Sequence, residues 1–187
     1  MDVPEAKLEQ TDAGLVPATA GWFVLNARDA KWNARPGRQS VSFTGKTEWE
    51  ADTLFPMLGV NLAVLEPGEP NSTYHWETEA EAFFIISGEA LLIVEGQERP
   101  LKQWDFAFCP PKTEHVIVGA GDGTCVGLAM SSRENQQFGP YGEYTKDEVA
   151  ARYGASPPET TQDGSMAYSQ TEKSQPTAYR EGWLQDR

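Results

Sequence analysis

Short apolar runs, separated by glycine and proline, fill the middle of this 187-residue chain. Between residues 40 and 130 they recur about every ten residues, and no helical period appears among them. Short strands at this spacing, punctuated by turn residues, are typical of an antiparallel sandwich or barrel. We therefore expect an all-β fold whose strands include 22–25, 41–43, 59–65, 82–86, 90–94, 104–109, 115–118 and 124–130.

The composition divides the chain into three parts. Residues 1–20 are polar and predict a loosely held N-terminal arm, whereas 21–135 carry the strands and predict the barrel. Residues 33–40 are rich in turn residues and predict a connection between the first two strands. Residues 136–187 predict a C-terminal helix and an irregular tail. A chain of this length is expected to form one domain.

The helix and tail have their own signals. Thr145, with Glu148 three residues later, has the pattern of a capping box and predicts a helix over 146–153 that stops at Gly154. The segment beyond it is polar and rich in proline, serine and threonine. We expect an irregular tail that wraps the domain or a partner subunit, or is partly disordered. The residues able to pin it are Tyr168, Tyr179 and Trp183.

Charge and composition narrow the partners. The formal charge of −13 argues against nucleic acid, which is bound through clustered lysine and arginine, and against anionic lipid. No run approaches the roughly 20 apolar residues of a membrane-spanning helix, and no secretory signal pattern opens the chain. The two cysteines, Cys109 and Cys125, lack metal-ribbon spacing and are interpreted as reduced thiols. Together these features favour a cytoplasmic protein.

The only two histidines lie in a pattern that suits a metal ion. His75 and Glu77 alternate along a strand and share a face, and Glu81 begins the next strand. His115 opens a further strand about thirty residues later. Imidazoles and carboxylates from neighbouring strands are donors that suit Mn, Fe, Ni or Zn. Glu79 has the same parity as Glu77 and is an alternative to Glu81.

These residues resemble the two motifs of the cupin superfamily. The first motif runs Gly, His-x-His, Glu, Gly, and corresponds here to Gly68, His75, Glu77, Glu81 and Gly88. The second contains Asp, Pro, Gly, His and Asn, and corresponds to residues 104–119 around His115. The resemblance covers about residues 60–130. It implies a double-stranded β-helix, or jelly-roll, barrel with His75, Glu77, Glu81 and His115 as metal ligands.

Three positions depart from the family pattern. Glu77 stands where a second histidine is usual, Lys112 where glycine is usual, and Gly119 where asparagine is usual. Two neutral histidines and two carboxylates would neutralise a divalent ion, lower its Lewis acidity and stabilise its higher oxidation states. This set favours Mn, Fe or Zn, with Ni as a further option, over Cu(I). The family spacing favours Glu81 over Glu79 as the ligand, and we expect Glu79 to be exposed in the turn.

The resemblance implies several functions, because one barrel hosts many activities. Our first hypothesis is a metal-dependent enzyme, of dioxygenase, isomerase or decarboxylase type, acting on a small organic molecule in the barrel. The alternatives are a non-catalytic module that binds a metabolite or metal, and a structural, storage-like barrel with an inactive site. We expect a homodimer, since such barrels pair through sheet edges and terminal segments.

Overall fold

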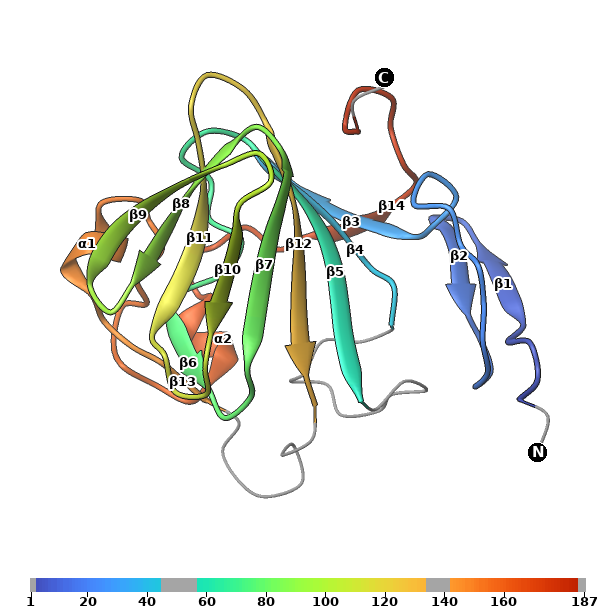
Figure 1. Ribbon diagram of the computed structural model, residues 1–187, viewed down its shortest axis with the longest axis horizontal. Helices are drawn as coiled ribbons and strands as arrows, with labels where there is room; N and C mark the ends of the chain where they lie inside the picture. Colours follow the sequence, from blue (N-terminus) through green and yellow to red (C-terminus); the bar gives the residue numbers. More distant parts are fainter. Residues whose placement is uncertain (1–2, 45–56, 134–141, 185–187) are drawn as a thin grey trace.

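Two antiparallel sheets face one another and form the barrel of the computed structural model (Figure 1). The structure describes residues 3–44, 57–133 and 142–184. One sheet has seven strands in the order β10-β7-β12-β5-β4-β3-β14, and the other has five in the order β13-β6-β11-β8-β9. The all-β jelly-roll architecture expected from the sequence is confirmed. The strands of the seven-stranded sheet are β3 (Trp32–Arg35), β4 (Arg38–Ser42), β5 (Leu58–Leu65), β7 (Glu81–Ser87), β10 (Phe106–Cys109), β12 (Cys125–Ser132) and β14 (Gln175–Thr177).

The five-stranded sheet carries both histidines, His75 on β6 and His115 on β11. Its strands are β6 (His75–Glu77), β8 (Glu89–Val94), β9 (Gln97–Lys102), β11 (His115–Ala120) and β13 (Gly142–Tyr144). The core between the two sheets is apolar, because alternate residues of each strand point inward. On β7, Phe83 and Ile85 are 6% and 1% exposed, whereas their neighbours Phe84 and Ile86 are only partly buried. The inner face of β7 therefore runs from a carboxylate, Glu81, into the core.

A second core covers the outer face of the seven-stranded sheet. Trp32, which is 0% exposed, packs there with Val41, Leu62 and Val64. Tyr179 and Trp183 of the C-terminal segment contact Trp32, with ring centroids 5.9 and 5.2 Å away. The tail also adds strand β14 beside β3 (Figure 1). It therefore wraps the barrel and is pinned by the aromatic residues expected from the sequence.

The strand expected over 22–25 is wrong. These residues form no strand, apart from an isolated bridge between Trp22 and Glu5, and Val24 is 82% exposed. Leu25 packs against the core around Trp32 without joining the sheet, so the apolar run alone was misleading. Instead, 32–42 form the β3–β4 hairpin, which turns at Gly37 with a φ of 74°. The residues interpreted as a connection are thus largely strand.

The two ends of the chain are more ordered than expected. At the N-terminus, β1 (Leu8–Thr11) and β2 (Gly14–Pro17) form a hairpin to the side of the barrel (Figure 1). At the C-terminus, helix α1 is shorter than expected and spans Glu148–Ala151. Its N-cap is Asp147, whose side chain accepts a hydrogen bond from the Ala150 N–H, so the expected cap at Thr145 is wrong. Helix α2 spans Gly164–Ala167. Neither of these helices has the length and apolar character needed to cross a bilayer.

Candidate metal centre

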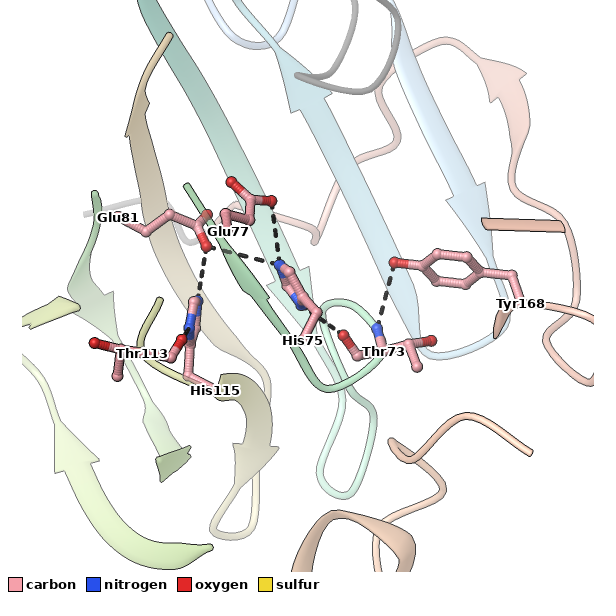
Figure 2. A network of polar contacts seen from close by, with 7 residues as sticks. All are labelled: Thr73, His75, Glu77, Glu81, Thr113, His115 and Tyr168. Carbon is pink, nitrogen blue, oxygen red and sulfur yellow. Dashed lines mark hydrogen bonds and ion pairs between the residues drawn. The ribbon is translucent and has the colours of Figure 1, made fainter. Parts of the chain in front are cut away.

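Strand pairing brings the two histidines together. His115, the first residue of β11, is the register partner of His75, the first residue of β6. Their ring centroids are 5.1 Å apart. Glu81 opens β7 in the facing sheet, and its carboxylate reaches across toward both rings (Figure 2). Residues 40 positions apart in sequence therefore converge between the sheets.

The ligand atoms of His75, Glu81 and His115 lie close enough together to bind a single ion. Oε2 of Glu81 lies 2.7 Å from Nε2 of His115 and 3.7 Å from Nε2 of His75. All three residues are buried, with 6%, 8% and 2% exposure for His75, Glu81 and His115. Their ligand atoms all lie within 4.8 Å of one another. Atoms bound to one ion at roughly 2.0–2.2 Å have separations of this order.

The second nitrogen of each imidazole fixes which tautomer is present. Nδ1 of His75 lies 2.6 Å from the Thr73 carbonyl oxygen, and Nδ1 of His115 lies 2.9 Å from the Thr113 carbonyl oxygen. A carbonyl oxygen only accepts hydrogen bonds, so each Nδ1 carries a proton and donates it. In a neutral ring, Nε2 therefore presents a lone pair to the Glu81 carboxylate. Metal-binding histidines are oriented by this kind of contact.

Two acceptors facing each other at 2.7 Å require a cation. Oε2 of Glu81 and Nε2 of His115 are both buried, and neither forms a hydrogen bond within the described part of the chain. A buried lone pair without a partner is costly, and both a proton and a metal ion would relieve the cost. The arrangement of these three residues therefore fits a bound divalent ion.

Glu77 lies beside this group. Its Oε1 is 3.2 Å from Nε2 of His75, and the residue is 2% exposed. The group whose ligand atoms lie mutually within 4.8 Å consists of His75, Glu81 and His115. The structure thus places all four residues singled out in the sequence in one site, with Glu77 at its edge (Figure 2).

The imidazoles and carboxylates of the site shift one another's pKa values. Burial lowers the pKa of His75, but Glu77, Glu81 and the Thr73 carbonyl outweigh it and raise this pKa to about 9. Burial raises the pKa of Glu81, but the facing imidazoles outweigh it and hold this pKa below its usual value. Each shift favours the charged form of its group, because a protonated imidazole and an ionised carboxylate attract one another.

Glu79, the alternative to Glu81 as a ligand, is buried. Glu79 is 4% exposed, and its Oε2 accepts a hydrogen bond of 2.6 Å from the Ser132 hydroxyl, so the expected exposure in the turn is wrong. The turn that carries Glu79 folds back against the end of β12. The alternation of residues around Glu79 does not indicate this contact with a distant strand.

The sequence contains a signal for these carbonyl partners. Both histidines follow a threonine by two positions, in Thr73-Tyr74-His75 and Thr113-Glu114-His115. In each case the threonine carbonyl holds Nδ1 of the histidine. A recurrent Thr-x-His pattern in a chain with only two histidines pointed to a shared role.

Two departures from the family pattern have local explanations. A Cβ atom at Gly119 would lie 2.2 Å from the Glu66 carbonyl oxygen, so the backbone of the adjacent turn excludes an asparagine there. Lys112 adopts a positive φ of 69°, a conformation that glycine takes without strain. Its backbone N–H donates to the Glu77 carbonyl at 2.7 Å and joins the two motif loops.

Apolar side chains form the walls beside the donor group. The Phe83 ring lies 5.4 Å from the His115 ring, and the Tyr144 ring lies 5.8 Å from the His75 ring. Cys109 is the register partner of Glu81 and packs in the core with Ile117. The donor group is therefore the polar end of an otherwise apolar interior.

Both cysteines are expected to be unreactive in the folded protein. Burial raises the pKa of the Cys109 and Cys125 thiols to about 11, and they are 2% and 1% exposed. The thiolate is the reactive form, so at pH 8 we expect almost no reaction with a disulfide reagent. After unfolding in guanidinium, two thiols per chain should react at once, and the absorbance of the released thiolate measures both. Rapid labelling of the native protein would contradict this burial.

Comparisons with known proteins identify the same region. Residues 61–131 match the family model described as "Cupin domain". A cupin of the RmlC-like type from Shewanella frigidimarina NCIMB 400 has a TM-score of 0.50 at 14% identity, covering 64% of this chain and 97% of that chain. A cupin-like protein from Thermotoga maritima has a TM-score of 0.49 at 20% identity, covering 67% and 88%.

A third structure has higher sequence identity over a shorter match. It is described provisionally as a sugar phosphate isomerase from Acidithiobacillus ferrooxidans ATCC 23270, with 28% identity and a TM-score of 0.43. The match covers 54% of this chain and 64% of that chain, which is less than two thirds of its length. A search of curated proteins finds no match. The match to the family model and the likeness to the Shewanella structure support the fold and leave the activity open.

Proposed function

We propose, from the match of residues 61–131 to the cupin domain model, that the protein is a metal-dependent enzyme acting on a small organic molecule. His75, Glu81 and His115 bind one divalent ion, and Glu77 adds a second carboxylate at the edge of the site. The observation that carries the proposal is the 2.7 Å approach of Glu81 Oε2 to His115 Nε2. Both atoms are buried acceptors, and a cation satisfies them together.

The donor set restricts the metal. Two imidazoles and one carboxylate are the set that non-haem iron oxygenases use with open coordination positions, and it also suits Mn, Zn and Ni. The site offers no thiolate at the three positions, which disfavours Cu(I). A metal held here supplies Lewis acidity and open positions for a substrate oxygen or O2.

The chain's own groups define the substrate class. The rings of Phe83 and Tyr144, which lie beside those of His115 and His75, suit an organic molecule with an apolar body. Glu77 keeps a carboxylate oxygen 3.2 Å from His75 Nε2, where it is placed to accept a proton from a bound molecule. This combination favours proton transfer or oxidation of a small oxygen-containing compound, as in an isomerase, a decarboxylase or a dioxygenase.

Elemental analysis tests the metal and chelation tests the activity. We expect protein purified without an affinity tag or chelator to hold about one Fe, Mn, Zn or Ni per chain. Turnover of a panel of small keto and hydroxy compounds, followed with an oxygen electrode and by mass spectrometry, should stop on chelation and return with the metal. Metal binding without turnover of any compound would favour a non-catalytic binding module. A protein that binds none of these ions would overturn the proposal.

We also propose a homodimer formed through the free edge of the seven-stranded sheet. In the described part of the chain β10 pairs with β7 alone, and Phe106 and Phe108 on β10 are each 60% exposed. An antiparallel edge is complementary to its own copy across a two-fold axis. The aromatic row is also uncharged, which lowers the repulsion between two chains of charge −13.

Sedimentation equilibrium tests the dimer. We expect twice the chain mass for the wild type and a 20.6 kDa species for a Phe106→Glu, Phe108→Glu double variant. Val24→Glu is the matched control, because Val24 is 82% exposed and lies away from β10. A wild type that sediments as a monomer, or a double variant that stays dimeric, would contradict this interface. Cytoplasmic location and the exclusion of nucleic acid stay predictions from composition.

A further inference from the structure

Both histidines of the metal site are oriented by a threonine carbonyl, but the two threonines are themselves held by different partners. In each case the carbonyl oxygen of a threonine two residues earlier accepts a hydrogen bond from Nδ1–H of the histidine. The N–H of Thr113 bonds to the Pro110 carbonyl at 3.1 Å, within the same short turn. The N–H of Thr73 instead bonds to the hydroxyl oxygen of Tyr168 at 3.3 Å, 95 positions away in sequence. The support of His75 therefore comes from the C-terminal segment.

Tyr168 lies in a segment that is tied to the strand next to His75. It directly follows helix α2, whose N-cap Asp163 accepts hydrogen bonds from the N–H and the hydroxyl of Ser165. Just before α2, Thr161 and Tyr144 exchange two backbone hydrogen bonds of 2.9 Å. Tyr144 is in turn the register partner of His75. The position of Tyr168 is thus fixed relative to β6.

Aromatic packing links the same residues by a second route. The Tyr144 ring lies 5.8 Å from the His75 ring and 5.4 Å from the Tyr168 ring, the latter in an edge-on arrangement. Tyr168 keeps 36% of its surface exposed, while its hydroxyl points inward to Thr73 (Figure 2). Burial of this hydroxyl raises the pKa of Tyr168. The phenol is therefore protonated at neutral pH and accepts the Thr73 N–H bond as a neutral group.

We propose that Tyr168 is a positioning residue for the metal centre. Its hydroxyl fixes the Thr73 backbone, the Thr73 carbonyl fixes the plane of the His75 ring, and Nε2 of His75 is thereby aimed at the site it shares with Glu81 and His115. The inference rests on the proposed metal-binding function. It assigns a role in the site to the segment after the barrel, which lies outside the residues that match the cupin family.

The test is a Tyr168→Phe variant titrated with Co²⁺, whose visible d–d absorption reports the arrangement of its ligands. Groups that orient a metal ligand typically change metal affinity by about 10–100-fold, and Tyr168 acts one residue further out. We therefore expect Co²⁺ to bind roughly 3–10-fold more weakly, with a changed d–d spectrum. The phenylalanine ring retains the packing on Tyr144, so the fold should persist.

Tyr179→Phe is the matched control, because its hydroxyl also accepts a backbone N–H bond, from Leu184 at 3.4 Å, but far from the site. Both variants should lower the unfolding midpoint by a similar amount, about 2–4 °C, whereas only Tyr168→Phe should alter Co²⁺ binding. Wild-type Co²⁺ affinity and spectrum in Tyr168→Phe would overturn the inference and leave the metal function intact. Absence of Co²⁺ binding in the wild type would overturn both.

Discussion

His115→Ala is expected to lose bound metal, with affinity lowered at least about 100-fold. This exceeds the 10–100-fold typical of groups that only orient a ligand, because His115 supplies a ligand atom itself. The variant keeps the Glu81 carboxylate buried but leaves it only the longer, 3.7 Å approach to His75 Nε2. Elemental analysis of the purified variant and titration with Co²⁺ measure the loss. Full metal content in this variant would show that the ion binds elsewhere.

A pair of glutamates provides the control for this prediction. Glu81 and Glu79 are both buried carboxylates, but only Glu81 faces the histidines, whereas Glu79 accepts a hydrogen bond from Ser132. Glu81→Gln should lose the metal, because the neutral amide removes the negative ligand. Glu79→Gln should keep it, because its side chain retains an oxygen for the Ser132 hydroxyl. The reverse result would assign the ligand role to Glu79.

Much of the candidate site was predictable from the sequence. Alternation placed His75 and Glu77 on one face, and the spacing to Glu81 and His115 matched that of a known pair of motifs. The structure brings these residues together through the register of β6 with β11. The spacing of residues predicted the site because each of these residues lies at the start or end of a short strand, where the adjacent turn fixes its position.

The parts that could not be predicted depend on contacts between distant segments. The exposure of Glu79 is decided by the end of β12, 53 positions away from it. The role of Tyr168 is decided by a bond to Thr73, which no local pattern indicates. The strand at Trp32 was missed because its sequence contains polar residues and a Pro-Gly turn. It forms because β4 and the tail strand β14 both pair with it.

The contacts of Trp32 also make it the side chain whose loss should cost the fold most. It is 0% exposed, its Nε1 donates to the Ala27 carbonyl at 2.8 Å, and the rings of Tyr179 and Trp183 pack on it. Trp32→Ala is expected to lower the free energy of unfolding by about 3–5 kcal/mol, as for other buried aromatic residues. For a chain of this size the midpoint should fall by on the order of 10 °C.

The same variant should release the tail before the barrel unfolds. Tyr179 and Trp183 lose their packing surface, while β14 keeps only three register pairs with β3. Limited proteolysis should therefore cut near Arg180 much faster than in the wild type, and mass spectrometry identifies the site. Trp104→Ala is the control: Trp104 is 62% exposed, so its loss should change the free energy of unfolding by less than about 1 kcal/mol. Cleavage near Arg180 at the wild-type rate would show that Trp32 does not pin the tail.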